Sequence, residues 1–197
     1  MRIDGDRVVT EPIKGTRPRA IDPLEDARLA EELAASRKDA AELTMIVDLC
    51  RNDLGRVALP GSVRTQPPVL TSHANVHHRS QQVSCKIDPT RVSPGDVLAA
   101  LFPPGSVTGA PKIRATQRIA ELEPFPRGVY CGAIGYISAC GKSAFNVAIR
   151  TAVFHRGSAR YHVGGGVVVD SDPSDEWLET EHKGSVLHRA LTGEHPP

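Results

Sequence analysis

The pattern of apolar and polar residues predicts long helices mixed with short strands. Residues 24–54 are rich in Ala, Glu, Leu, Arg and Lys, contain no Gly or Pro, and are followed by Gly55, which favours one long helix. Further helices are expected at residues 97–102, 111–122 and 174–191, because Pro or Ser stands where each would begin.

Short β-rich runs alternate with these helices. Strands are expected at residues 7–10 and 83–87, a loop at 15–19, and largely irregular structure at 58–75. The last part carries three β-rich runs separated by glycine turns, which favours an antiparallel meander: residues 133–138, 144–154 and 160–169. The expected fold class is therefore α+β.

Composition and charge exclude several classes of function. The formal net charge is +1 and no basic stripe is interleaved with aromatics, which argues against nucleic acid as a partner. No apolar run approaches the roughly 20 residues that span a bilayer, and no signal peptide is evident, so a cytoplasmic location is expected. The four cysteines lack metal-site spacing and are expected to be reduced packing residues.

Two helices carry acidic side chains in positions that could serve a metal. Glu176, Glu179 and Lys183 share one stripe of the last helix, where carboxylates could hold a hard cation beside an anionic ligand. Glu42 interrupts an apolar stripe of the long helix, and burying it would require a partner or a metal. The alternative is a solvated helix face in both cases, with Arg37 or Arg51 pairing with Glu42.

Two further segments are ambiguous by themselves. The loop 104–112 leads into a helix, whose N-terminal N–H groups suit an anionic ligand, but the segment also reads as an ordinary turn. Lys14 lies between a strand and a loop, where a desolvated lysine can act as a nucleophile or base, but most loop lysines are solvated charges.

Six motifs in order resemble the chorismate-binding enzyme family. This family includes anthranilate, aminodeoxychorismate, isochorismate and salicylate synthases. The motifs are E-P-I-K-G-T-R-P-R (11–19), A-E-L-T-M-I-V-D-L-C-R-N-D-L-G-R-V (41–57), F-P-P-G-S-V-T-G-A-P-K-I-R-A (102–115), C-G-A-I-G-Y-I-S (131–138), N-V-A-I-R-T (146–151) and G-G-G-V-V-V-D-S-D-P-S-D-E-W-L-E-T-E-H-K (164–183). The resemblance implies the C-terminal part of an α/β sandwich, with a partial family domain at residues 1–192 and a tail at 193–197.

The resemblance also implies roles for individual residues. Mg²⁺, which grips a carboxylate of chorismate, would be held by Glu42 and Glu179 with Glu176 close by. His78 falls at the histidine beside the reacting ring. The remaining positions, which bind the substrate or line its pocket, are Thr108, Gly109, Tyr136, Arg150, Gly165 and Lys183.

Lys14 indicates the subclass. It stands in P-I-K-G-T, which resembles aminodeoxychorismate synthase component I, whereas anthranilate synthases typically have Ala at this position. The implied reaction is amination of chorismate at C4, with Lys14 as covalent nucleophile and His78 transferring a proton. Ammonia would come from a glutamine amidotransferase partner, and the product would lead to para-aminobenzoate, for folate or for an antibiotic precursor. The alternatives are an isochorismate, salicylate or anthranilate synthase, or an inactive truncated remnant.

Two departures from the family pattern bear on these expectations. Arg79-Ser80-Gln81 follows His78 where the family usually has L-V-S, which affects the packing of that strand. Family members are also roughly twice as long, and the N-terminal half, with its S-P-E-x-F segment, is expected to be missing here. Unpaired strand edges would then favour association.

Overall fold

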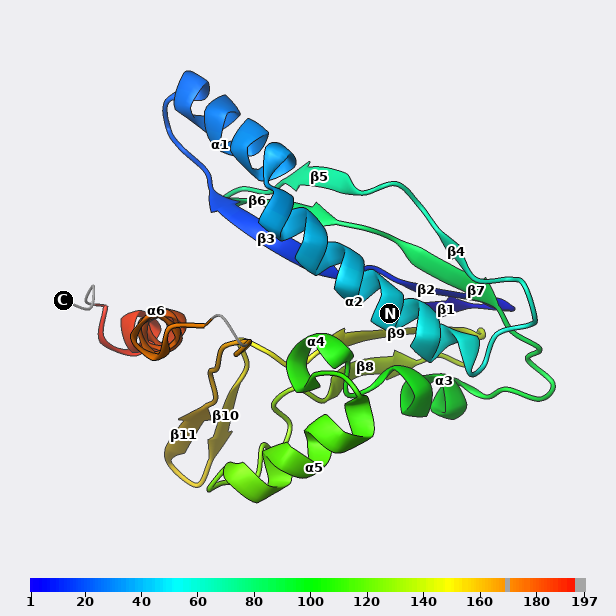
Figure 1. Ribbon diagram of the computed structural model, residues 1–197. Helices are drawn as coiled ribbons and strands as arrows, with labels where there is room; N and C mark the ends of the chain where they lie inside the picture. Colours follow the sequence, from blue (N-terminus) through cyan, green and yellow to red (C-terminus); the bar gives the residue numbers. More distant parts are fainter. Residues whose placement is uncertain (169–170, 194–197) are drawn as a thin grey trace. The chain divides into compact units, whose positions relative to one another are not determined.

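The computed structural model describes residues 1–168 and 171–193, apart from the side chain of Val186 (Figure 1). The chain divides into two compact units, Met1–Gly105 with Gly135–Asn146, and Ser106–Ile134 with Val147–Pro197. The helices are α1 (Pro23–Ala35), α2 (Arg37–Gly55), α3 (Pro94–Leu101), α4 (Gly105–Thr108), α5 (Lys112–Leu122) and α6 (Pro173–Thr192). None of these described helices combines the length and apolar character needed to cross a membrane.

The strands form antiparallel sheets, which confirms the predicted α+β class. Their bounds are β1 (Arg2–Asp4), β2 (Arg7–Thr10), β3 (Ile13–Pro18), β4 (Arg64–Thr65), β5 (Val69–Ser72), β6 (Val76–Ser80), β7 (Val83–Lys86), β8 (Ala133–Ile137), β9 (Lys142–Val147), β10 (Ala152–His155) and β11 (Ser158–Tyr161). A six-stranded sheet has the order β4-β7-β2-β1-β9-β8, a three-stranded sheet the order β3-β6-β5, and β10 pairs with β11.

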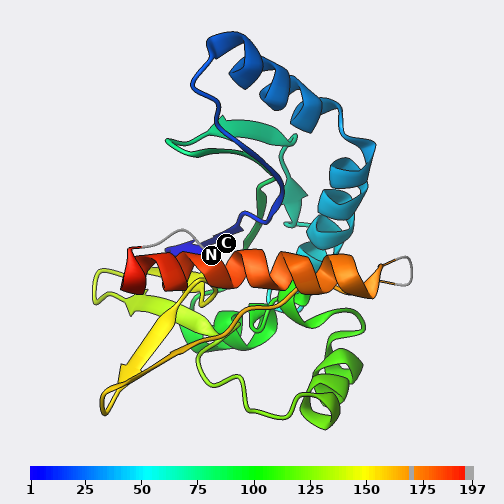
Figure 2. The same ribbon diagram turned by 90° about the vertical axis from the view of Figure 1, so that its left-hand side faces the viewer.

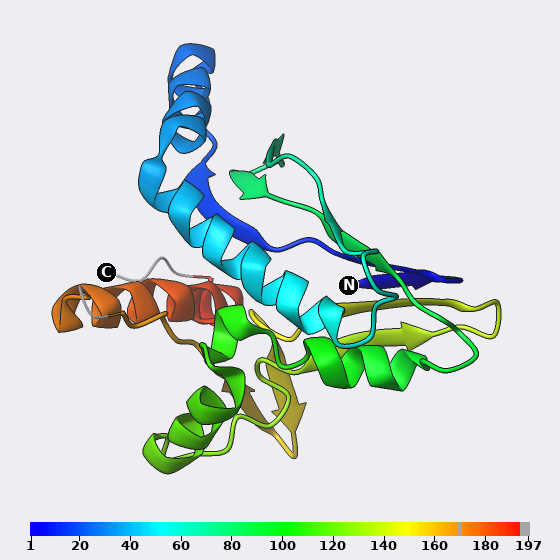
Figure 3. The same cartoon turned by 45° about the vertical axis from the view of Figure 1, so that its right-hand side comes forward.

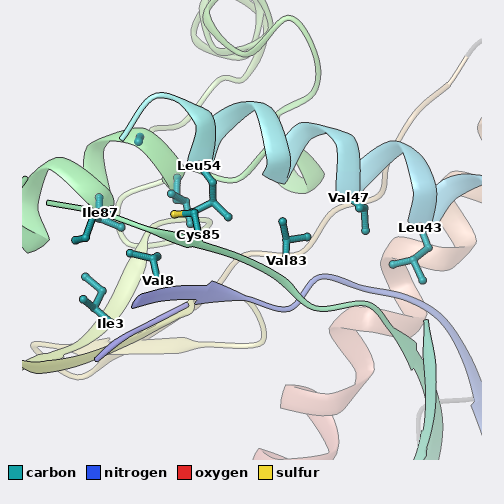
Figure 4. Packing of buried hydrophobic residues seen from close by; sticks show 11 residues of the cluster. Ile3, Val8, Leu43, Val47, Leu54, Val83, Cys85 and Ile87 are labelled. Atoms are coloured by element: carbon teal, nitrogen blue, oxygen red, sulfur yellow. The ribbon is translucent and has the colours of Figure 1, made fainter. Parts of the chain in front are cut away.

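The main core of the first unit lies between the six-stranded sheet and helices α2 and α3. Figure 4 shows apolar side chains of the strands, such as Val8 and Cys85, facing Leu54 and Val47 of α2. In Figure 3 the C-terminal end of α2 (cyan) lies next to α3 (green). Each fully buried side chain of this size stabilises the fold by about 1.5–3 kcal/mol, so this core fixes α2 on the sheet.

The helix expected at residues 24–54 is two helices, and that prediction is corrected at Ser36. Ser36 has extended backbone angles, and its hydroxyl accepts a hydrogen bond from the Asp39 amide at the start of α2. A serine in this position satisfies an otherwise unpaired N–H at a helix start. Figure 2 shows the resulting change of direction between α1 (blue) and α2 (cyan).

Three further expectations about local structure are corrected. The segment expected as a loop at 15–19 lies largely in β3, which pairs with β6 through a bulge between Ile13 and Thr16. The run expected at 144–154 is divided into β9 and β10, with Arg150 in the left-handed region at φ 53°. The expected meander is therefore wrong, because β9 lies between β1 and β8 whereas β10 pairs with β11 in a separate sheet. The run expected at 160–169 is a strand only to Tyr161, and residue 169 lies outside the described part of the chain.

The remaining helix predictions are confirmed. Ser93 and Asp96 form a capping box at the start of α3, as the Ser-Pro-Gly-Asp sequence indicates. Helices α5 and α6 match the expected bounds within two residues, and Gly193 ends α6 in the left-handed region. Of the expected tail, residues 194–197 lie outside the described residues.

Candidate active site

Lys14 lies on β3, an edge strand of the three-stranded sheet. The next residue, Gly15, has φ +90°, and a Cβ there would come within 2.7 Å of Leu33, so only glycine fits this bulge. The bulge directs Lys14 toward α2, where its Nζ donates a hydrogen bond to Glu42 Oε2 at 3.0 Å. Both side chains are 36% exposed, so the pair is accessible to a ligand.

Glu42 has a cationic partner, which is neither of the arginines considered from the sequence. One turn earlier on α2, Asp39 pairs with Arg17 of the same strand at 3.3 Å. The side chains of Lys14 and Arg17 therefore both reach α2 from β3. Arg51, by contrast, pairs with Asp48. The structure thus brings the predicted nucleophile and one predicted metal ligand into direct contact.

His78 lies on β6, the central strand of this sheet, opposite Thr16 of β3 and Thr71 of β5. Successive side chains on a strand point to opposite faces. Since His77 contacts Asp26 of α1 at 3.0 Å, His78 faces away from the helices, whereas Lys14 faces them. The structure therefore places Lys14 and His78 on neighbouring strands but on opposite faces of the sheet, and it does not bring them into direct contact.

The polar residues that follow His78 have defined partners. Arg79 donates hydrogen bonds to the carbonyl oxygens of Ala34 and Ser36, at the end of α1. Ser80 donates to Glu11 Oε1 at 2.9 Å. The departure from the family pattern at these positions is therefore accommodated by hydrogen bonds to carbonyls and a carboxylate.

In the second unit, α6 carries three of the predicted residues. Asp172 caps the helix by accepting hydrogen bonds from the amides of Ser174 and Asp175. Lys183 Nζ lies 2.5 Å from Glu179 Oε1 and donates to the carbonyl oxygen of Gly164 at 2.9 Å. Arg150 donates to the carbonyl oxygen of Lys183 at 3.3 Å. The structure thus gathers Arg150, Glu179 and Lys183 beside the glycine segment.

Glu176 lies directly against Gly165. Its Oε1 accepts a hydrogen bond from Ser171 at 2.6 Å, whereas its Oε2 is buried and has no hydrogen-bond partner among the described residues. A Cβ on Gly165 would lie 2.5 Å from this oxygen. A buried carboxylate oxygen without a partner is costly, so it suits a bound cation.

The described residues therefore supply part of a Mg²⁺ site. Mg²⁺ commonly uses only one or two protein carboxylates and keeps water or ligand oxygens, which Glu176 and Glu179 could satisfy. Among residues 1–168 and 171–193, no group of three His, Cys, Asp or Glu side chains is placed to hold a metal. The third expected ligand, Glu42, pairs with Lys14 in the first unit.

The other predicted residues occupy separate places. Thr108 is the last residue of α4, and Gly109 follows it with φ +114°, where a side chain would be strained. Tyr136 lies on β8 and is 59% exposed. The predicted site residues thus fall into a group in the first unit and a group in the second.

Two further residues near these groups were not predicted. The ring of His73 packs edge-on against that of His78, with centroids 5.2 Å apart. The Tyr130 hydroxyl would lie 3.2 Å from a Cβ on Gly164, and burial raises the pKa of Tyr130 to about 12. A tight-turn prediction at Ala74-Asn75 would have placed His73 beside His78, whereas nothing in the local sequence links Tyr130 to Gly164.

The predicted site residues thus include ion pairs at a strand edge and beside a glycine segment. The chain belongs to the chorismate-binding enzyme family, because the model of that family, described as chorismate binding enzyme, matches residues 1–189. The family expected from the sequence motifs is thereby confirmed.

Individual relatives carry two different names. The chain is 45% identical over 190 residues to aminodeoxychorismate synthase component 1 of Salmonella typhimurium, covering 95% of this chain and 42% of the relative. It is 45% identical over 192 residues to anthranilate synthase component 1 of Streptomyces coelicolor, covering 97% and 37%. The crystal structure of anthranilate synthase component I from Streptococcus pneumoniae superposes with a TM-score of 0.84 at 38% identity, covering 95% of this chain and 41% of that one. The chain therefore spans about two fifths of the length of these relatives.

Proposed function

We propose that this chain carries the catalytic lysine of an enzyme that aminates chorismate at C4 to give 4-amino-4-deoxychorismate. Identity to relatives does not separate this reaction from anthranilate synthesis, since both kinds of relative are 45% identical. The observation that carries the proposal is Lys14, which stands in P-I-K-G-T and is held by Glu42 at the accessible edge of a sheet.

In the proposed reaction, Lys14 acts as the covalent nucleophile. Its Nζ, as the free amine, bonds to C2 of chorismate while the two ring double bonds shift and the C4 hydroxyl leaves. Ammonia then bonds to C4, the double bonds shift back, and the C2–Nζ bond breaks to restore the amine. Ammonia gives up one proton and the departing hydroxide gains one, so chorismate and ammonia yield the aminated product and water.

His78 is proposed to accept the proton that ammonia releases. Burial lowers the pKa of His78, and His73 lowers it further, which favours the neutral ring that can accept a proton. Lys14 lies on the edge strand β3 and His78 on the neighbouring strand β6, and neighbouring strands are about 4.8 Å apart. The proposed reaction requires the chorismate ring to lie across this edge, between the two side chains.

The carboxylates of Glu176 and Glu179 are proposed to hold Mg²⁺, with Lys183 nearby to bind an anionic group. The bound ion would supply positive charge for a carboxylate of chorismate. A separate glutamine amidotransferase is proposed as the source of ammonia, in keeping with the component 1 names of the relatives.

The second candidate is anthranilate synthesis, which the relative from Streptomyces coelicolor favours. It places the new amino group at C2 and has no role for an amine already bonded there. Lys14→Ala therefore separates the two reactions. The variant should lose amination at C4, while an anthranilate synthase would keep its product.

The test is to incubate the purified protein with chorismate, Mg²⁺ and ammonium and to identify products by liquid chromatography with mass detection. We expect 4-amino-4-deoxychorismate from the natural chain and from Lys38→Ala, which removes an exposed lysine at the start of α2. Lys14→Ala should form none above background. If Lys14→Ala formed as much 4-amino-4-deoxychorismate as the natural chain, the proposed role of Lys14 would be wrong.

A further inference from the structure

The hairpin of β5 and β6 presents two histidines on the face that the helices do not cover. Thr71 of β5 is opposite His78, and His73 stands two residues after Thr71, on the same side. The two rings meet edge to face, with centroids 5.2 Å apart and planes inclined by 62°. His73 is exposed, whereas His78 is partly buried.

The opposite face of the hairpin is anchored by hydrogen bonds. Ser72 Oγ lies 2.9 Å from His77 Nδ1, and His77 Nε2 lies 3.0 Å from Asp26 Oδ1. Arg19 donates to Asp26 and, at 2.7 Å, to the carbonyl oxygen of His73. The backbone on both sides of the turn is therefore held to α1 and β3, which fixes His73 against His78.

The residues directly opposite His78 on the neighbouring strands are uncharged. On β3 the opposite residue is Thr16, and on β5 it is Thr71. Ser80, on the same face of β6 as His78, donates a hydrogen bond to Glu11 Oε1. On the helix face, the ionic groups pair with one another or with backbone carbonyls: Arg17, Arg19, Asp26 and Arg79. His73 is thus the titratable group in ring contact with His78.

We propose that His73 is a positioning residue that keeps His78 unprotonated, so that His78 can accept a proton in the reaction. The inference rests on the proposed role of His78. A proton on one ring opposes a proton on the other, because like charges a few ångströms apart repel. Burial and His73 both lower the pKa of His78, which agrees with the contact. The proposed role of the exposed His73 ring is therefore its effect on His78.

The test is a titration of His78 by NMR in the natural chain, with its ring signals assigned by their loss in His78→Gln. His73→Asn removes the titrating neighbour, and the midpoint of His78 should rise. His73→Lys restores a positive charge at the same position, and the midpoint should return toward that of the natural chain. His155→Asn, an exposed histidine of β10, is the matched control and should leave His78 unchanged.

Two outcomes would overturn the inference: an unchanged midpoint in His73→Asn, or a rise of equal size in His73→Asn and His73→Lys. An equal rise in both variants would show that packing of the His73 ring, and not its charge, determines the titration midpoint of His78. The measurement uses no substrate, so it stands even if no aminated product forms. Where product does form, kcat/KM should fall at low pH as His78 becomes protonated. In His73→Asn, the pH at which this fall occurs should rise together with the NMR midpoint.

Discussion

At the scale of single residues, Gly165 is as important as the charged groups it accompanies. Its backbone lies against Glu176, whose buried Oε2 is the strongest indication of a cation site in the second unit. Sequence reasoning predicted both residues from the family motif. It could not predict that they touch, because the contact depends on how the segment before α6 folds back on the helix.

Gly165→Ala should weaken Mg²⁺ binding about tenfold, which corresponds to about 1.4 kcal/mol. The added Cβ would lie 2.5 Å from Glu176 Oε2, so the carboxylate has to move away from its position beside Ser171. Gly166→Ala is the matched control, since a Cβ there meets nothing within 4 Å. Isothermal titration calorimetry measures the Mg²⁺ affinity of both variants. Equal affinities of Gly165→Ala and Gly166→Ala would contradict the proposed cation site.

Lys14 illustrates what local sequence can and cannot supply. The P-I-K-G-T motif identified it as the candidate nucleophile, but 28 residues separate it from Glu42. The pairing arises because the bulge at Gly15 directs Lys14 toward α2. Neither arginine considered from helical spacing occupies that position, since spacing along one helix says nothing about a strand that packs against it.

At the scale of elements, propensity predicted helix over residues 24–54 correctly but missed the interruption. Ser36 is compatible with a helix interior by propensity alone, and its role as a cap appears only when its backbone is extended. The loop expected at 15–19 became part of β3 for a similar reason. Gly15 and Pro18 are turn signals locally, yet β6 supplies a partner strand that overrides them.

Ser36→Ala should lower the free energy of unfolding by about 1 kcal/mol, because the Asp39 amide loses its acceptor. Ser36→Asp keeps an oxygen in the same place and should retain most of the stability. Denaturant unfolding followed by circular dichroism measures both. If the alanine and aspartate variants unfold at the same denaturant concentration, the hydroxyl does not cap α2.

The anchor between α1 and the hairpin should make stability depend on acid pH. Hydrogen bonds from Arg19, then from the Ala20 amide and His77, hold the pKa of Asp26 well below its ordinary value of 3.8. A carboxyl with a depressed pKa contributes stability above its unfolded value and loses it as pH falls toward the folded value. Stability supplied by Asp26 should therefore be present near neutrality and decline below about pH 4.

Asp26→Asn tests this expectation by denaturant unfolding at about pH 6 and about pH 3. The variant should be less stable than the natural chain at the higher pH, and the difference should shrink at the lower pH. Glu31→Gln is a suitable control, because Glu31 is an exposed acid on the same helix. A difference that is the same at both pH values would show that the charge of Asp26 does not stabilise the fold.

At the scale of the whole molecule, the order of strands in the sheet shows why the sequence pattern could not predict the topology. β1 at the N-terminus lies between β2 and β9, so segments about 140 residues apart in the chain pair directly, as Ile3 does with Ser143. Alternation of polar and apolar residues identifies a strand and its buried face, but not its neighbour. The succession of helices and strands predicted the fold class, whereas the pairing of the strands required the structure.

The six-stranded sheet ends in β8, whose residues are all exposed. Ile134, Tyr136 and Ile137 are each more than half exposed on this strand. An edge strand with apolar side chains and free backbone groups is a ready surface for pairing with another chain. We therefore expect the purified chain to associate in a concentration-dependent manner through β8.

Ile137→Lys should shift the chain toward monomer in sedimentation velocity across a dilution series, because a charge on an edge strand opposes strand pairing. Ile113→Lys is the matched control: Ile113 is 70% exposed on α5, away from any strand edge. If surface charge alone prevented association, both variants would be equally monomeric. An effect confined to Ile137→Lys would instead identify β8 as the associating edge, and undiminished association of that variant would exclude it.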